Sequence, residues 1–144
     1  MVIVPPSFDD IELFGNVKKL LEPAGFGKFS FTTAEEHDQV IAYTSQLPHV
    51  VASAYVRSPL MLGHHGFSAG SFRDMSRVAS VDENLWTELF QQNREPLLVE
   101  LDGLIERLTQ YRDALRDGDE EGLRGLLREG RERKAETEKR GKKQ

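Results

Sequence analysis

Two polar side chains flank a proline in the segment 44–49, and their types suit substrate binding or proton transfer. Ser45 and His49 are four residues apart, so on a helix they share a face, beside the kink that Pro48 should introduce. His37 lies two turns earlier and about 80° around the helix. Each residue alone is equally well explained by a structural role, but together they favour a site.

Two arginines make the second candidate. Arg73 and Arg77 are one helical turn apart, with Asp74 between them. An ordinary surface ion-pair cluster explains this spacing. The functional interpretation is a guanidinium group that holds a carboxylate through two parallel hydrogen bonds.

Metal binding and nucleotide binding both have weak support. His64 and His65 would have to join His37 and His49 as metal ligands, but adjacent histidines without a nearby carboxylate are a poor signal, so we expect no metal site. The absence of cysteine excludes thiolate sites and disulfides, and favours a reducing compartment. No glycine pattern matches G-x-G-x-x-G after a strand, so we expect no dinucleotide cradle in this chain.

The first 32 residues predict a strand, a helix and a second strand. Residues 1–4 form a short apolar run, Ser7 can cap the helix, and residues 29–31 form the second strand. Parallel strands normally belong to larger covered sheets, so we expect residues 1–32 to be the trailing edge of a doubly wound Rossmann domain. A small cap on the helical body is the alternative.

The remaining chain predicts helices. Thr33–Glu36 and Ser80–Glu83 have capping-box spacing, Pro96 should bend a long helix, and Gly118 followed by Asp119 should end it and start another. Segment 58–70 predicts a loop or broken helix. The long helix carries a heptad seam, which predicts packing in a homodimer. The seam consists of Leu97, Leu101, Leu104, Leu108, Tyr111 and Leu115.

Composition narrows the partners. The 144 residues carry a net charge of −5. Eight basic and four acidic residues from Arg128 to Gln144 give that segment +4, so the other 127 residues carry −9. An acidic body disfavours nucleic acid, and no apolar stretch reaches the ~20 residues of a membrane span. No secretory signal is visible, so we expect a cytoplasmic protein.

Two spaced motifs resemble the signature of prephenate dehydrogenases. Glu36-His37-Asp38 followed by residues 44–49 (TSQLPH) is similar to the usual E-H-D and S-H-L-P-H at the same spacing. Residues 66–77 (GFSAGSFRDMSR), with Trp86 and Asn93-Arg94 beyond them, match a second block. Gln46 stands where histidine is common, and Ser71 where glycine is common.

The resemblance, which covers residues 1 to about 135, implies a fold and a reaction. The family joins an N-terminal dinucleotide-binding domain to a helical, intertwined dimerisation domain like the C-terminal domain of 6-phosphogluconate dehydrogenase. It oxidises prephenate with NAD or NADP, releasing carbon dioxide and giving 4-hydroxyphenylpyruvate in tyrosine biosynthesis. The family's proton-accepting histidine precedes the residues present here.

Site residues follow from the same resemblance. Ser45 and His49 would line the substrate pocket, Arg77 would hold a substrate carboxylate, and Trp86 would lie nearby. The backbone of Gly70 would approach the substrate, and His37 would have a supporting role. An always-charged, bidentate arginine suits a substrate with two carboxylates.

We therefore expect a mainly α protein, the C-terminal part of a prephenate dehydrogenase. Its expected domains are residues 1–32, the end of a nucleotide-binding domain, and 33–140, the helical substrate-binding and dimerisation domain, with a disordered tail at 141–144. The chain alone should form a homodimer and supply substrate-binding residues without catalysing the reaction. The alternatives are an arogenate dehydrogenase and a non-catalytic helical dimerisation or regulatory module.

Overall fold

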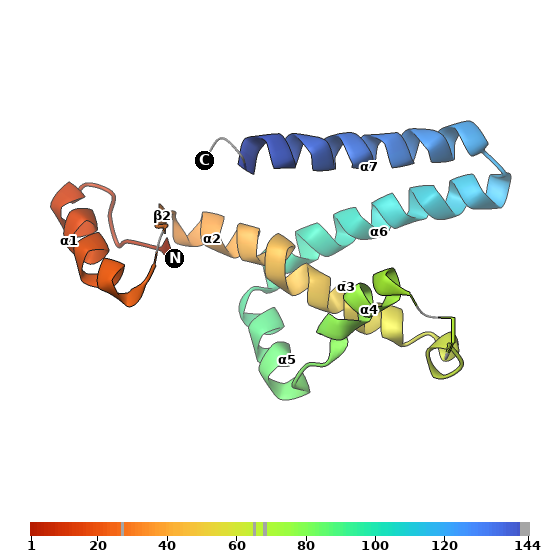
Figure 1. Ribbon diagram of the computed structural model, residues 1–144, viewed down its shortest axis with the longest axis horizontal. Coiled ribbons are helices and arrows are strands. Elements are labelled where there is room, and N and C mark those ends of the chain that lie inside the picture. The colour runs from red at the N-terminus through yellow and green to blue at the C-terminus, as the bar shows by residue number, and fades with distance from the viewer. Residues whose placement is uncertain (27, 65, 68, 142–144) are drawn as a thin grey trace. The chain divides into compact units, whose positions relative to one another are not determined.

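The computed structural model confirms a mainly helical fold with one small sheet (Figure 1). It divides into two compact units, Met1–Glu100 and Leu101–Gln144. The structure describes residues 1–26, 28–64, 66–67 and 69–141.

The expected strand–helix–strand unit is present. β1 (Val2–Ile3) pairs in parallel with β2 (Ser30–Phe31), and α1 (Ile11–Leu21) followed by the short turn η1 (Glu22–Ala24) connects them. Phe14 of α1 packs on Phe31 of β2, with ring centroids 4.6 Å apart. The parallel register explains why a helix must cross between the strands.

The cap predicted for α1 is wrong. Asp10, not Ser7, caps this helix, because its carboxylate accepts a hydrogen bond from the Leu13 N–H at 2.8 Å. The Ser7 hydroxyl donates instead to Asp9 at 2.8 Å. Both residue types favour caps, and the carboxylate at the helix start adds a favourable interaction with the helix dipole.

The helix that carries the first motif is interrupted. α2 (Ala34–Ile41) begins as expected at Thr33, whose hydroxyl accepts from the Glu36 N–H at 3.1 Å. It continues into a π-helical turn, η2 (Ala42–Gln46), and then α3 (Leu47–Val56). The Leu47 N–H reaches back five residues to the Ala42 carbonyl. This turn accommodates Pro48, which lies in the first turn of α3 and has no N–H to donate.

Segment 58–79 folds back onto α3. It contains the 3₁₀ turn η3 (Pro59–Leu62), α4 (Gly70–Ser76) and the 3₁₀ turn η4 (Arg77–Ala79), and both α4 and η4 pack against α3. The broken helix predicted for residues 58–70 is confirmed where it is described. His65 and Ser68 lie outside the described residues.

The long helix expected after residue 80 is two helices. α5 (Glu83–Gln92) ends at Asn93, and α6 (Arg94–Asp117) starts directly after it. Asp82, not Ser80, caps α5, through a hydrogen bond from the Leu85 N–H at 2.8 Å. The break therefore comes before Pro96, which lies in the first turn of α6, where its missing N–H costs nothing.

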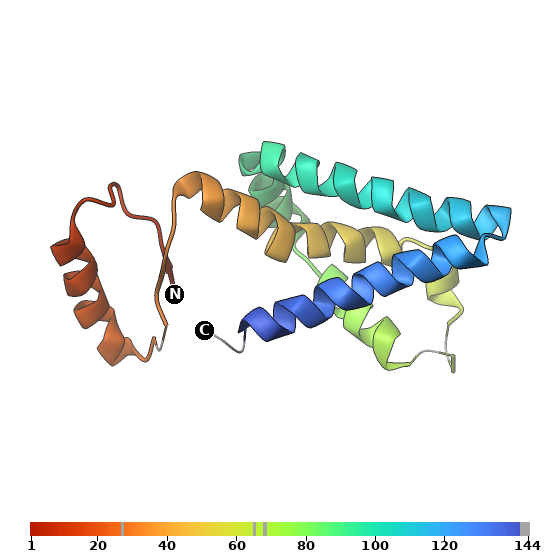
Figure 2. The ribbon, with the colours of Figure 1, turned by 90° about the horizontal axis from the view of Figure 1, so that it is seen from above.

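The turn after α6 agrees with the prediction. Gly118 has φ +66°, its N–H bonds to the Leu115 carbonyl, and the Asp119 N–H bonds to the Ala114 carbonyl at 2.9 Å. This is a Schellman motif. Asp119 then accepts from the Gly122 N–H and starts α7 (Glu120–Gly141), which runs back in the opposite direction (Figure 2). Beyond Gly141, the tail predicted for 141–144 lies outside the described residues.

The apolar core is small. In the described part of the chain, the apolar residues that are buried are Ala42, Leu47, Ala52 and Leu97. The heptad seam starts at buried Leu97 but becomes exposed along α6, to 56% at Leu108 and 65% at Leu115. α7 buries no residue. Within the second unit, the second half of α6 and α7 therefore leave apolar side chains exposed.

The left-handed turn at Gly118 predicts a specific cost. Gly118→Ala should lower the free energy of unfolding by about 1 kcal/mol, because a Cβ disfavours positive φ. Gly125→Ala in α7 is the control: a Cβ there meets nothing within 4 Å, and alanine should stabilise by about 0.5–1 kcal/mol. Urea unfolding followed by circular dichroism measures both, and equal effects of the same sign would contradict the turn geometry.

Candidate functional site

His49 and Trp86 form the centre of the candidate site. His49, in the first turn of α3, has its Nδ1 atom 2.8 Å from the Val78 carbonyl oxygen. Because a carbonyl only accepts, Nδ1 carries the hydrogen, and Nε2 is left to interact with a ligand. The imidazole lies against the indole of Trp86 from α5, with ring centroids 3.7 Å apart and planes 41° apart. Backbone and indole together fix the orientation of this ring.

Arg77 directly precedes Val78, the residue whose carbonyl bonds to His49. It is the first residue of η4, and its side chain is exposed. Across the described residues, no ion pair or side-chain hydrogen bond involves Arg77, Arg73 or Asp74, so the expected surface ion-pair cluster is not formed. An exposed guanidinium without a partner retains its full capacity to bind a carboxylate.

The other predicted residues are distributed around this centre. Ser45 lies in η2, half-buried, and within the described structure its hydroxyl makes no hydrogen bond. Gly70 starts α4 with an ordinary negative φ, and an added Cβ would meet nothing within 4 Å. Nothing in the single chain therefore requires glycine at position 70. His37 pairs with Asp38, Nδ1 to Oδ1 at 3.0 Å, and is not joined to His49.

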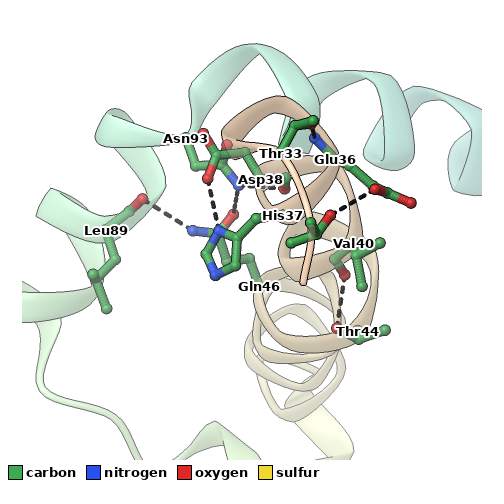
Figure 3. Close-up of polar contacts among 10 residues, drawn as sticks. Thr33, Glu36, His37, Asp38, Val40, Thr44, Gln46, Leu89 and Asn93 are labelled. Atoms are coloured by element: carbon green, nitrogen blue, oxygen red, sulfur yellow. Dashed lines mark hydrogen bonds and ion pairs between the residues drawn. The ribbon is translucent and has the colours of Figure 1, made fainter. Parts of the chain in front are cut away.

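Gln46 is a residue whose role sequence reasoning missed. It is only 6% exposed, and its side-chain amide connects η2 to the junction between α5 and α6 (Figure 3). Nε2 donates to the Leu89 carbonyl at 3.1 Å, and Oε1 accepts from the Asn93 side chain at 2.8 Å. The same Asn93 amide donates to the Asp38 carbonyl at 2.9 Å. The signal available in the sequence was an amide in place of the usual histidine.

The described residues gather no three His, Cys, Asp or Glu side chains that could hold a metal ion. The His64 ring is instead engaged structurally, with Nδ1 2.7 Å from the Met61 carbonyl and its ring 4.3 Å from that of Phe72. His65, the other half of the proposed pair, lies outside the described residues. Nor does any described helix combine the length and apolar character needed to cross a membrane.

Comparison with known families identifies the chain. The model of the prephenate dehydrogenase dimerization domain matches residues 33–129, which include the candidate site. The chain belongs to the prephenate dehydrogenase family. This confirms the resemblance drawn from the two motifs and the expectation of a helical dimerisation domain.

Curated relatives agree with this family. The chain is 34% identical over 131 residues to cyclohexadienyl dehydrogenase from Zymomonas mobilis, with 83% of this chain and 43% of the relative covered. It is 28% identical to prephenate dehydrogenase from Bacillus subtilis, with coverage of 85% and 34%. The chain thus spans less than half the length of these relatives.

Solved structures agree as well. Synechocystis arogenate dehydrogenase superposes with a TM-score of 0.78 at 25% identity, over 94% of this chain and 51% of that chain. Prephenate dehydrogenase from A. aeolicus, in complex with hydroxyphenyl propionate and NAD+, gives 0.76 at 27% identity, over 94% and 49%. Both superpositions cover almost the whole of this prephenate dehydrogenase family member.

The contact between His49 and Trp86 predicts a difference in fluorescence. Trp86 is the one tryptophan of the sequence, so the emission of the chain reports on the surroundings of this indole. His49→Ala should shift the emission maximum of Trp86 to longer wavelength, because water replaces the imidazole beside the indole. His37→Ala is the control and should leave the emission maximum unchanged, because His37 pairs with Asp38. An emission maximum that His49→Ala leaves unchanged would show that the two rings are apart.

Proposed function

We propose that this chain supplies the substrate-binding and dimer-forming part of an enzyme that oxidises prephenate with NAD or NADP. The products are carbon dioxide and 4-hydroxyphenylpyruvate, for tyrosine biosynthesis. Residues 1–32 would then end a nucleotide-binding domain, and residues 33–140 would form the helical domain. The observation that carries the proposal is that Arg77, whose exposed side chain makes no ion pair with any described residue, directly precedes Val78, the residue whose carbonyl orients His49.

These side chains suit an aromatic precursor with two carboxylates. Arg77 would bind one carboxylate through two parallel hydrogen bonds, and the Ser45 hydroxyl would donate a further one. The Nε2 atom of His49 would donate to the same substrate when protonated, or accept from its hydroxyl when neutral. Trp86 would shield His49 from water on the indole side, which strengthens the electrostatic contacts of its ring.

The nicotinamide cofactor would accept the hydride from the ring carbon that bears the hydroxyl, and loss of carbon dioxide would restore aromaticity. We assign no cofactor-binding residue in this chain, because Gly63, Gly66 and Gly70 follow no strand and do not have the spacing of a phosphate-binding turn. The chain's own contribution is to position the substrate and manage a proton.

Arogenate is the second candidate substrate, favoured by the likeness to Synechocystis arogenate dehydrogenase. Arogenate carries an ammonium group where prephenate carries a ketone, whereas both retain two carboxylates. Arg77 would serve either substrate. Calorimetric titration of the chain with prephenate and with arogenate distinguishes them, and binding of neither would favour the non-catalytic dimerisation module.

We also propose a homodimer. The matched family model is described as a dimerization domain. In addition, Leu108 and Leu115 of α6 and Leu127 of α7 are more than half exposed. Rows of exposed leucines on a helix are a typical interface signal, and a second copy of the same surface would bury them.

Arg77 predicts the main kinetic effect. In an enzyme that joins this chain to a nucleotide-binding domain, Arg77→Ala should cost about 2–4 kcal/mol of transition-state stabilisation, or roughly 30- to 1000-fold in kcat/KM. Arg77→Lys should recover only part, because an ammonium cannot make the planar bidentate contact. Reduction of NAD or NADP measures the rate.

Arg73→Ala is the matched control for this prediction, since it removes another exposed guanidinium, one helical turn earlier, that makes no ion pair with any described residue. It should cost much less than Arg77→Ala. The assignment of the carboxylate anchor would be wrong if Arg73→Ala proved the damaging change and Arg77→Ala stayed near the wild-type rate.

The homodimer predicts a mass near twice 16.3 kDa by light scattering at micromolar concentration. Replacing Leu104 and Leu108 together by Asp should dissociate or unfold the chain, since buried unpaired carboxylates are costly. Gln110→Asp, an exposed change outside the seam, should leave the mass unchanged. A monomer with full helical content in the unmodified chain would refute the dimer.

A further inference from the structure

A buried amide pair holds the end of α5 against η2. Gln46 is nearly fully buried, donates from Nε2 to the Leu89 carbonyl at 3.1 Å and accepts at Oε1 from Asn93 at 2.8 Å. The Leu89 carbonyl also accepts the Asn93 N–H at 3.3 Å, which closes the last turn of α5. The Gln46 amide therefore makes two hydrogen bonds at this turn, as a donor to the Leu89 carbonyl and as an acceptor from the Asn93 side chain.

The helical segment that contains Gln46 contacts α5 again about one turn further on, in α3. His49 lies three residues after Gln46, and its ring partner Trp86 lies three residues before Leu89. Three residues advance an α-helix by about 4.5 Å. The contacts of Gln46 with Leu89 and of His49 with Trp86 therefore follow one another along two antiparallel segments. The hydrogen bond at Gln46 consequently fixes which residue of α5 lies opposite His49.

We propose that Gln46 is a positioning residue that sets the register of α5 against α3 and thereby holds Trp86 on the ring of His49. The register argument depends only on contacts within the chain. The consequence for substrate rests on the proposed function, in which His49 binds the substrate.

The amide chemistry is what this position requires. The Leu89 carbonyl needs a donor, and the Asn93 side chain needs an acceptor. Methionine at position 46 has a similar length but supplies no donor and only a weak acceptor, whereas a protonated glutamic acid supplies both a donor and an acceptor. An ionised glutamate keeps the acceptor but turns an oxygen toward the Leu89 carbonyl, where two acceptors repel. These substitutions separate hydrogen bonding from simple space filling.

The first experiment uses Gln46→Met in the full chain, with the sole tryptophan as the probe. The nuclear Overhauser contacts between the rings of His49 and Trp86 should weaken, and the emission maximum of Trp86 should shift to longer wavelength, while circular dichroism keeps its helical signal. Undiminished ring contacts and an unchanged emission maximum in a folded Gln46→Met variant would overturn the proposal, because Gln46 would then only fill space.

The second experiment keeps the proposal testable should Gln46→Met fail to fold. In Gln46→Glu, ring contacts between His49 and Trp86 should be present below the titration of the new carboxyl group and weaken above it. Gln91→Glu, the same change at an exposed position of α5, is the matched control, because it keeps every ionisable group of the native chain. Its ring contacts should show no such step.

Two outcomes of this second experiment overturn the proposal. One is ring contacts in Gln46→Glu that do not depend on pH, or that follow the same course as in Gln91→Glu. The other is a Gln46→Glu chain that fails to fold at every pH, since its acid form offers the same donor and acceptor as the native amide. Neither experiment uses substrate, so failure of the proposed enzymatic function would leave both results interpretable.

Discussion

The missing N–H of Pro48 is the constraint on which the candidate site depends. An α-helix through this position would need that donor, and the chain instead forms a π-helical turn in which Leu47 bonds to Ala42. The extra residue rotates everything after it by about 100° relative to α2. Gln46 and His49 consequently face α5, while His37 remains with Asp38. The motif's two histidines do not share one site because they lie 12 residues apart, about 18 Å along the helix axis.

The second constraint on the fold is that the described chain buries few apolar side chains. In the first unit, the buried apolar residues that the structure describes are few, namely Ala42, Leu47, Ala52 and Leu97. In the second unit, α7 is held by ion pairs along its own surface, such as Arg133 with Glu129 at 2.8 Å. An exposed pair of this kind contributes only about 0.3–0.5 kcal/mol. Burial against another molecule is what such helices need, which agrees with the family's description as a dimerization domain.

The preferences of single residues for helix caps and turns predict most helix ends. Competition between neighbouring residues with similar preferences explains the errors. Thr33, Gly118 and Asp119 act as their residue types indicate. The predicted bend at Pro96 was wrong because proline is well tolerated in the first turn of a helix, so the break came at Asn93. The arrangement of the candidate site is harder to predict from the sequence than the helix ends. Spacing along one helix grouped Ser45 with His49, but the contact of His49 with Trp86 joins separate helices, and only packing reveals it.

The substitution at Gln46 shows how the site and the packing are linked. A neutral imidazole also has one donor and one acceptor, so the usual histidine at this position has the hydrogen-bonding capacity to hold Leu89 and Asn93 in the same way. Protonation would convert the acceptor into a second donor facing the Asn93 amide, which already donates there. Glutamine avoids this conflict because its amide does not titrate. The chain thereby keeps the hydrogen bonds of residue 46 to Leu89 and Asn93 independent of pH, one turn away from the contact between His49 and Trp86.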